Sequence, residues 1–93
     1  MSKSLSNEEL EKSFKEYSEK VKSLDNVNNE DKLFLYSYYK QSLFGDNINP
    51  KPSIFNRVEM EKWKSWNNLV GKDKKECMEE YIKKVKLLLM ERR

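Results

Sequence analysis

The sequence predicts an all-α protein, a small four-helix bundle with one longer crossover connection. Only two glycines and two prolines interrupt its 93 residues, and β-branched residues are scarce, so long helices with short connections are expected. Apolar side chains recur at helical spacing in four segments. A chain of 93 residues has room for one modest core, so residues 1–93 are expected to form a single domain.

The first predicted helix opens at Ser6, whose hydroxyl is placed to cap the free backbone amides. Glu9, three residues later, is placed to reach back to the start of the helix and complete a capping box. One face of this helix is apolar, which predicts that it packs against the rest of the bundle. The members of this stripe are Leu10, Phe14, Tyr17, Val21 and Leu24.

A polar stretch, 25–29, breaks the periodicity before the second helix. Asn28 or Asn29 is placed to cap the start of that helix, because a short side-chain oxygen can accept from a free backbone amide. The helix is expected to run to Phe44 and to stop at Gly45, since glycine readily adopts the left-handed conformation that ends helices.

The longest connection is 45–55, which contains both prolines and no helical pattern. It is the expected crossover. Asn56 and Glu59 then form a capping pair for the third helix. That helix is expected to end near Val70, with Gly71 as its left-handed terminator.

Asp73 and Glu76 form the capping pair of the fourth helix, and Arg92 and Arg93 lie at its electronegative end. This helix carries the most apolar stripe of the chain. Four amphipathic helices in so short a chain must bury their stripes against one another, which predicts an antiparallel type of bundle. The fourth stripe consists of Cys77, Met78, Tyr81, Ile82, Val85, Leu88 and Leu89.

Composition narrows the functional classes. The net charge of +3 comes from 19 basic and 16 acidic residues that are interspersed, which favours a compact anion over nucleic acid. The chain has no histidine and one cysteine, Cys77, so we expect no metal site, no catalytic residue and a buried, inert thiol. It has no long apolar run, and 1–5 has no apolar core that could serve as a signal peptide, so a reducing, cytoplasmic location is expected.

Two lysines stand where helical spacing calls for apolar residues. Lys40 interrupts a stripe of the second helix, and Lys62 interrupts a stripe of the third. A single such lysine often lays its stem on apolar surface and extends its ammonium into water. Two of them, each flanked by aromatic residues, point instead to an anion held against an aromatic wall. The other stripe members are Leu33, Tyr36, Leu43 and Phe44 in the second helix, and Val58, Trp66, Leu69 and Val70 in the third.

The aromatic residues beside these lysines have alternative interpretations. Tyr36 and Tyr39 share a helix face with Lys40, where they form either a binding cluster or part of the core. Trp63 and Trp66 either anchor the core or stack a nucleobase, as in single-strand binders. No continuous basic groove accompanies the tryptophans, which argues against nucleic acid. In the fourth helix, glutamates among the lysines favour a solvated bundle face over a membrane-surface helix.

At this point the chain resembles the acyl-CoA-binding protein family, from about Phe14 to Leu87. Four blocks carry the resemblance in matching order and spacing. They are Phe34-Leu-Tyr-Ser-Tyr-Tyr-Lys-Gln41, Gly45-Asp46, Lys62-Trp-Lys-Ser-Trp-Asn67 and Tyr81-Ile-Lys-Lys-Val85.

The resemblance implies a four-helix bundle that binds medium- to long-chain fatty acyl-CoA esters. It implies an intracellular carrier and pool-former, not an enzyme, with no cofactor. In the family pattern, aromatic residues of the second helix flank the adenine, lysines gather around the phosphates, and Tyr81 reaches across from the fourth helix. The ligand-binding positions carried over by the resemblance are Lys22, Tyr36, Tyr39, Lys40, Lys62 and Tyr81.

The chain departs from the family pattern in two regions. Glu59 and Glu61 precede Lys62 where the family has small or basic residues, so phosphate binding is expected to be slightly weaker. Tyr38 is a smaller change and is expected to be surface-exposed. The acyl chain is expected to pass Ser18, Lys32 and Leu33, and the lysine there is not an obvious apolar wall.

The expected partner is therefore a long-chain acyl-CoA, with no nucleic acid, no stable membrane insertion and a monomeric protein. The alternative is a helical protein- or nucleic-acid-interaction module that uses the aromatic and basic surface. An accessory enzyme is a third alternative, and the lack of histidine and of an activated nucleophile disfavours it.

Overall fold

The structure, a computed structural model, describes residues 7–91. The expected cap at Ser6 and the terminal arginines Arg92 and Arg93 lie outside the described residues. The described part contains helices and no strand, which confirms the all-α prediction. Its elements are α1 (Asn7–Lys20), the 3-10 helix η1 (Val21–Ser23), α2 (Asn29–Phe44), α3 (Arg57–Asn67) and α4 (Lys74–Glu91).

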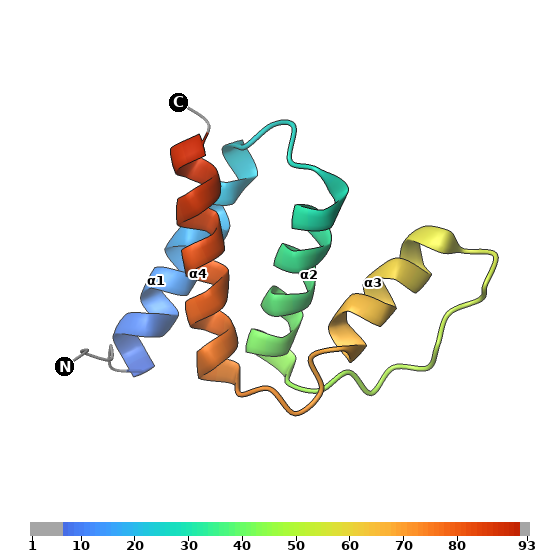
Figure 1. The fold of residues 1–93 in the computed structure, drawn as a ribbon. Coiled ribbons are helices and arrows are strands. Elements are labelled where there is room, and N and C mark those ends of the chain that lie inside the picture. The colour runs from blue at the N-terminus through green and yellow to red at the C-terminus, as the bar shows by residue number, and fades with distance from the viewer. Residues whose placement is uncertain (1–6, 92–93) are drawn as a thin grey trace.

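The helices are arranged around α4. This helix packs on both α1 and α2, and α3 packs against α2. Figure 1 shows α2 and α3 running in the same direction, because the long connection between them returns the chain to the opposite end of the molecule. That connection is the predicted crossover, and it places α3 at one side of the bundle, away from α1.

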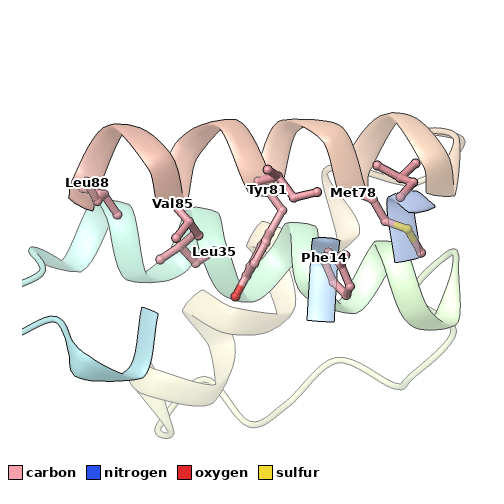
Figure 2. Packing of buried hydrophobic residues seen from close by; sticks show 8 residues of the cluster. Phe14, Leu35, Met78, Tyr81, Val85 and Leu88 are labelled. Carbon is pink, nitrogen blue, oxygen red and sulfur yellow. The ribbon is translucent and has the colours of Figure 1, made fainter. Parts of the chain in front are cut away.

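The core lies where α4 meets α1 and α2 (Figure 2). Cys77 and Val85 of α4 are fully buried, with no exposed surface. Every predicted member of the α4 stripe is buried except Leu89, which packs half-buried against the core cluster, so this stripe is confirmed. The cluster consists of Leu10, Phe14, Leu35, Met78, Tyr81, Ile82, Val85 and Leu88.

The ends of α1 and α2 follow the local sequence. α1 ends at Lys20 and continues as the single 3-10 turn η1, so the predicted stripe leaves regular α-helix before Val21. The Asn28 side chain caps α2 by accepting from the Asp31 amide at 2.8 Å. Gly45 ends α2 with φ +80°, a conformation that favours glycine, and its amide donates to Gln41 O at 3.0 Å.

The predicted stripe of the third helix is wrong in part. α3 ends at Asn67 and turns fill the stretch up to Gly71, whose φ is +90°. Val58 and Val70 are 64% and 52% exposed. The buried residues of α3 are Met60 and Trp66, because α3 packs mainly on α2 and needs only a narrow contact face.

The predicted stripe of the second helix is also not its buried face. Tyr36 is half-buried, whereas Phe44 is 62% exposed. Since α2 is flanked by α4 on one side and α3 on the other, its buried residues are spread around it. Tyr38, expected at the surface, is half-buried and stacks on Phe34 with ring centroids 4.3 Å apart. The buried residues of α2 are Leu35, Ser37, Gln41 and Ser42.

Two further findings concern the described part of the chain. None of its helices is long and apolar enough to cross a membrane. Its cysteine, aspartate and glutamate side chains form no group of three or more that is placed to hold a metal ion.

Candidate functional site

The two misplaced lysines meet at one aromatic ring. The Lys40 ammonium lies 5.7 Å from the centroid of Tyr36, and the Lys62 ammonium lies 5.4 Å from the same centroid. One lysine comes from α2 and the other from α3, so the packing of these helices brings the two charges together. Two ammonium groups beside one aromatic ring can together attract an anion.

Lys40 is held more firmly than Lys62. Its ammonium also lies 5.0 Å from the ring of Phe44 and 5.7 Å from that of Trp66, so aromatic rings surround it. The Lys62 side chain is 39% exposed, and its ammonium lies 3.8 Å from the Glu59 carboxylate. An anion that binds Lys62 therefore meets this carboxylate, as expected from the glutamates before Lys62.

Tyr36 connects the lysine pair to a groove. The groove has a volume of about 690 Å³ and lies among α1, η1, the loop before α2, and the inner sides of α2 and α4. Ser18 and Lys32 line it as expected, whereas Leu33 is not among its lining residues. The lining consists of Ser18, Glu19, Val21, Lys22, Leu24, Asp25, Asn26, Val27, Lys32, Leu35, Tyr36, Tyr39 and Tyr81.

Two aromatic rings that line this groove, Tyr39 and Tyr81, pack on a third ring, Phe14. Phe14 stacks on Tyr39 with centroids 5.5 Å apart and contacts Tyr81 at 4.9 Å, and the two tyrosine rings lie 5.9 Å apart. Tyr81 is only 3% exposed and belongs to the core, whereas Tyr39 is 36% exposed. Figure 2 shows the Tyr81 ring extending from α4 towards α2, with its hydroxyl oxygen at the far end.

Tyr36 and Tyr81 are both protonated at neutral pH. Burial raises the pKa of Tyr81 to about 12, with a further contribution from Tyr39. Burial also raises the pKa of Tyr36, and the Glu59 carboxylate raises it further. Their hydroxyl groups are therefore available as hydrogen-bond donors.

Lys22 lies at the rim of the groove. Its side chain is 70% exposed, and its ammonium lies 3.4 Å from Glu19 on the preceding helical turn. Such an exposed pair is held weakly. The structure therefore brings Lys22, Tyr36, Tyr39 and Tyr81 into one groove, and brings Lys40 and Lys62 together over the Tyr36 ring at its edge.

Comparisons with known proteins identify the family of this chain. The sequence model of the family described as "Acyl CoA binding protein" matches residues 11–85. The chain belongs to the acyl-CoA-binding protein family. It is 47% identical over 83 residues to acyl-CoA-binding domain-containing protein 2 of Oryza sativa subsp. japonica, covering 88% of this chain and 91% of that protein.

Two further comparisons support membership of this family. The chain is 43% identical over 83 residues to the acyl-CoA-binding protein of Ricinus communis, covering 88% of this chain and 92% of that protein. The crystal structure of Oryza sativa acyl-CoA-binding protein 2 superposes with a TM-score of 0.85 at 47% identity, covering 88% of this chain and 92% of that one. The four-helix fold is thus that of the family.

A polar brace in this family member fixes α2 against α3. The Gln41 amide nitrogen donates to Asp46 Oδ1 at 2.9 Å and to Lys72 O at 3.0 Å. The Trp66 indole donates to Gln41 Oε1 at 3.2 Å and to Gly45 O at 2.9 Å. Because Lys40 precedes Gln41 directly and Lys62 lies one turn before Trp66, this brace fixes the helix backbones that carry the two lysines.

A second cavity adjoins the groove and was not expected from the sequence. It has a volume of about 830 Å³ and shares Ser18 and Tyr39 with the groove. Its lining includes the buried side chains of Leu10, Phe14 and Met78. Ser42 also lines it, and among the described residues its buried hydroxyl has no hydrogen-bond partner. The apolar surface therefore continues past Tyr39.

The brace was also not predicted from the sequence, although Gln41 offers a signal for it. Gln41 is an amide in the matched block of α2, five residues before Asp46, and it is 1% exposed. A buried amide requires partners.

The thiol of Cys77 behaves as expected: it is fully buried, and burial raises its pKa to about 11, so it is protonated and unreactive at neutral pH.

Proposed function

We propose that this protein binds medium- to long-chain fatty acyl esters of coenzyme A and acts as a carrier and reservoir for them. Its membership of the acyl-CoA-binding protein family supports this proposal. The observation that carries it is the pair of ammonium groups beside the Tyr36 ring, at the edge of a groove of about 690 Å³. A ligand that joins a compact polyanion to a long apolar chain requires both the cationic pair and the groove.

The head group is assigned to the aromatic and basic end of the site. Lys40 and Lys62 bind phosphate oxygens, Tyr36 and Tyr39 flank the adenine, and Lys22 closes over the rim. Each desolvated charge-assisted contact contributes about 1.5 to 3 kcal/mol. Free fatty acids lack the phosphates and the base, so these residues determine which molecule is accepted.

The acyl chain is assigned to the groove beside Tyr39 and Tyr81, whose rings pack on Phe14. Each buried methylene contributes about 0.8 kcal/mol, so a dozen give on the order of 10 kcal/mol before ordering costs. The chain therefore supplies most of the affinity, and the head group supplies identity and orientation. The Lys32 stem at the groove wall sets how well the chain is covered.

We propose that the protein leaves its ligand unchanged and acts as a monomer. The titratable groups that line the groove are three tyrosines, two lysines and the carboxylates Glu19 and Asp25, with no histidine or thiol among these described residues. The Cys77 thiol is buried away from it and protonated. These features support a carrier rather than a catalyst.

The test is calorimetric titration with a long-chain acyl-CoA, with free coenzyme A and with the free fatty acid. We expect tight binding of the acyl-CoA, weaker binding of free coenzyme A and little binding of the acid. Equal affinity for the acid and the thioester would show that the head-group assignment is wrong. Steeply salt-dependent binding of an oligonucleotide, without any response to acyl-CoA, would favour the interaction-module alternative.

A further inference from the structure

A tight turn just before α3 presents two large apolar side chains to water. The Asn56 amide donates to Ser53 O at 3.0 Å, and the Phe55 amide donates to Ser53 Oγ at 3.1 Å. Ile54 and Phe55 occupy the two central positions of this turn and are 73% and 89% exposed. Glycine, proline, asparagine, aspartate and serine are the usual residues there. Two apolar side chains in such a turn indicate a surface that another apolar phase covers.

Basic residues flank this tip. Lys51, Arg57 and Lys64 line a shallow depression of about 280 Å³ together with Ile54, and Glu61 is the acidic residue in that lining. Arg57 is the first residue of α3, where the helix dipole disfavours a positive charge. Its position therefore does not serve the stability of the helix. Cations around an exposed apolar tip match an anionic phospholipid surface.

The loop is fixed to α3 before it reaches the tip. The Asn47 amide donates to Trp63 O at 3.3 Å, and the Trp63 indole donates to Asn49 O at 2.9 Å. Figure 1 shows the start of α3 at the side of the molecule away from α1 and α4. The tip is thus held out rigidly by the helix that also carries Lys62.

We propose that the tip of Ile54 and Phe55, with its flank of Lys51, Arg57 and Lys64, docks peripherally on anionic phospholipid bilayers. The two side chains enter the apolar boundary and the cations contact lipid phosphates. So small an apolar surface gives reversible attachment. The contact itself is independent of the ligand. Its use, to bring the Lys62 end of the site to a surface where long-chain acyl-CoA partitions, rests on the proposed function.

The test is flotation of the full chain with vesicles of phosphatidylcholine, with and without phosphatidylserine. Wild type is expected to float with the anionic vesicles. The Ile54→Ser/Phe55→Ser variant is expected to lower partitioning about ten-fold or more. Ile48→Ser is the matched control, because Ile48 lies in the same loop and is 90% exposed, and it is expected to change partitioning little.

The charge component has its own control. Arg57→Gln is expected to lower partitioning about five-fold on phosphatidylserine vesicles only. Lys12→Gln, at an exposed position of α1, is expected to have little effect. Equal losses for Arg57→Gln and Lys12→Gln would show non-specific charge attraction and overturn the proposed surface.

Two other results would also overturn it: partitioning that the tip variant does not reduce, or sedimentation showing a dimer that the tip variant abolishes while vesicles are not bound. The latter would assign the tip to a second copy of the chain. Calorimetry in the absence of vesicles separates this proposal from the proposed function. The tip variant is expected to keep wild-type affinity for acyl-CoA, and an absence of that affinity in wild type would refute the carrier function alone.

Discussion

At the scale of single residues, the site depends on where two ammonium groups lie. Lys40 is caged by Tyr36, Phe44 and Trp66 and contributes a preorganised charge. Lys62 contacts the Tyr36 ring, and its ammonium lies 3.8 Å from the Glu59 carboxylate. Replacing each residue is therefore expected to have a different effect on binding.

Lys40→Met keeps most of the apolar stem and removes the charge. We expect it to weaken acyl-CoA binding ten-fold or more, in line with the loss of a charge-assisted contact of about 1.5 to 3 kcal/mol. Its midpoint of thermal unfolding is expected to stay close to that of wild type, because the stem still covers the rings. Tyr36→Phe, which removes only the hydroxyl, is also expected to weaken acyl-CoA binding. Calorimetry and thermal unfolding check both, with Lys12→Met as the control. A large loss of stability would assign Lys40 and Tyr36 to the core instead.

Glu59→Gln removes the carboxylate that competes with bound phosphate at Lys62. We expect acyl-CoA to bind a few-fold more tightly, since exposed pairs couple by only about 0 to 1 kcal/mol. Glu61→Gln changes net charge equally, but Glu61 lines the depression beside Lys64 and Arg57, so it is expected to change affinity less. Equal gains for both variants would indicate a general charge effect.

At the scale of elements, polar contacts set the position of α2 against its two neighbours. The brace of Gln41, Asp46 and Trp66 fixes it to α3. On the other side, the Lys84 ammonium of α4 lies 2.7 Å from the Asp31 carboxylate in the first turn of α2. Both connections bear on stability more than on ligand contact.

The brace predicts a pH dependence of stability. The backbone amide of Gly71 and then the Gln41 side chain lower the pKa of Asp46 below its ordinary value of 3.8, against an opposing effect of desolvation. Because the folded pKa lies below the unfolded one, the stabilisation is present above pH 3.8 and is lost as the pH falls through the folded pKa. Urea unfolding of Asp46→Asn across this acid range is expected to show a shallower decline than wild type. Glu8→Gln, at an exposed position of α1, is the control, and an unchanged decline in Asp46→Asn would contradict the role of the brace.

The ion pair between α4 and α2 is expected to stabilise the fold. The Lys84 and Asp31 side chains are only 23% and 21% exposed, so Lys84→Met is expected to lower the free energy of unfolding by about 1 to 2 kcal/mol. Lys83 pairs with Glu80 at 3.8 Å and is 77% exposed. Lys83→Met is therefore the matched control, with a change within about 0.5 kcal/mol. Chemical denaturation measures both, and similar losses would show that the ion pair contributes little.

At the scale of the whole molecule, the sequence predicted the parts that depend on local signals. The α4 stripe, the Asn28 cap and the stop at Gly45 follow from spacing and side-chain chemistry, and all are present. The predicted end of α3, near Val70, lies too late in the chain. Apolar residues after Asn67 keep helical spacing, although the chain turns there. Only tertiary packing decides that Val58 remains exposed.

The candidate site likewise has features that local sequence indicates and features that depend on tertiary packing. Lys40 and Lys62 stood out because they broke the pattern of their helices, and their meeting over one ring depends on the packing of α2 against α3. Lys22 has no local signal, since an exposed lysine beside Glu19 is ordinary. The second cavity arises from side chains of three helices, and no single segment encodes it.

The central claim is that Lys40 and Lys62 together recognise the nucleotide end of the ligand while the groove holds its chain. The most direct measurement is calorimetric titration of wild type and of Lys40→Met/Lys62→Met with a long-chain acyl-CoA and with the acyl-pantetheine of equal chain length. We predict that wild type prefers the coenzyme A ester and that the double variant loses most of this preference. A double variant that keeps the full wild-type preference would contradict this account.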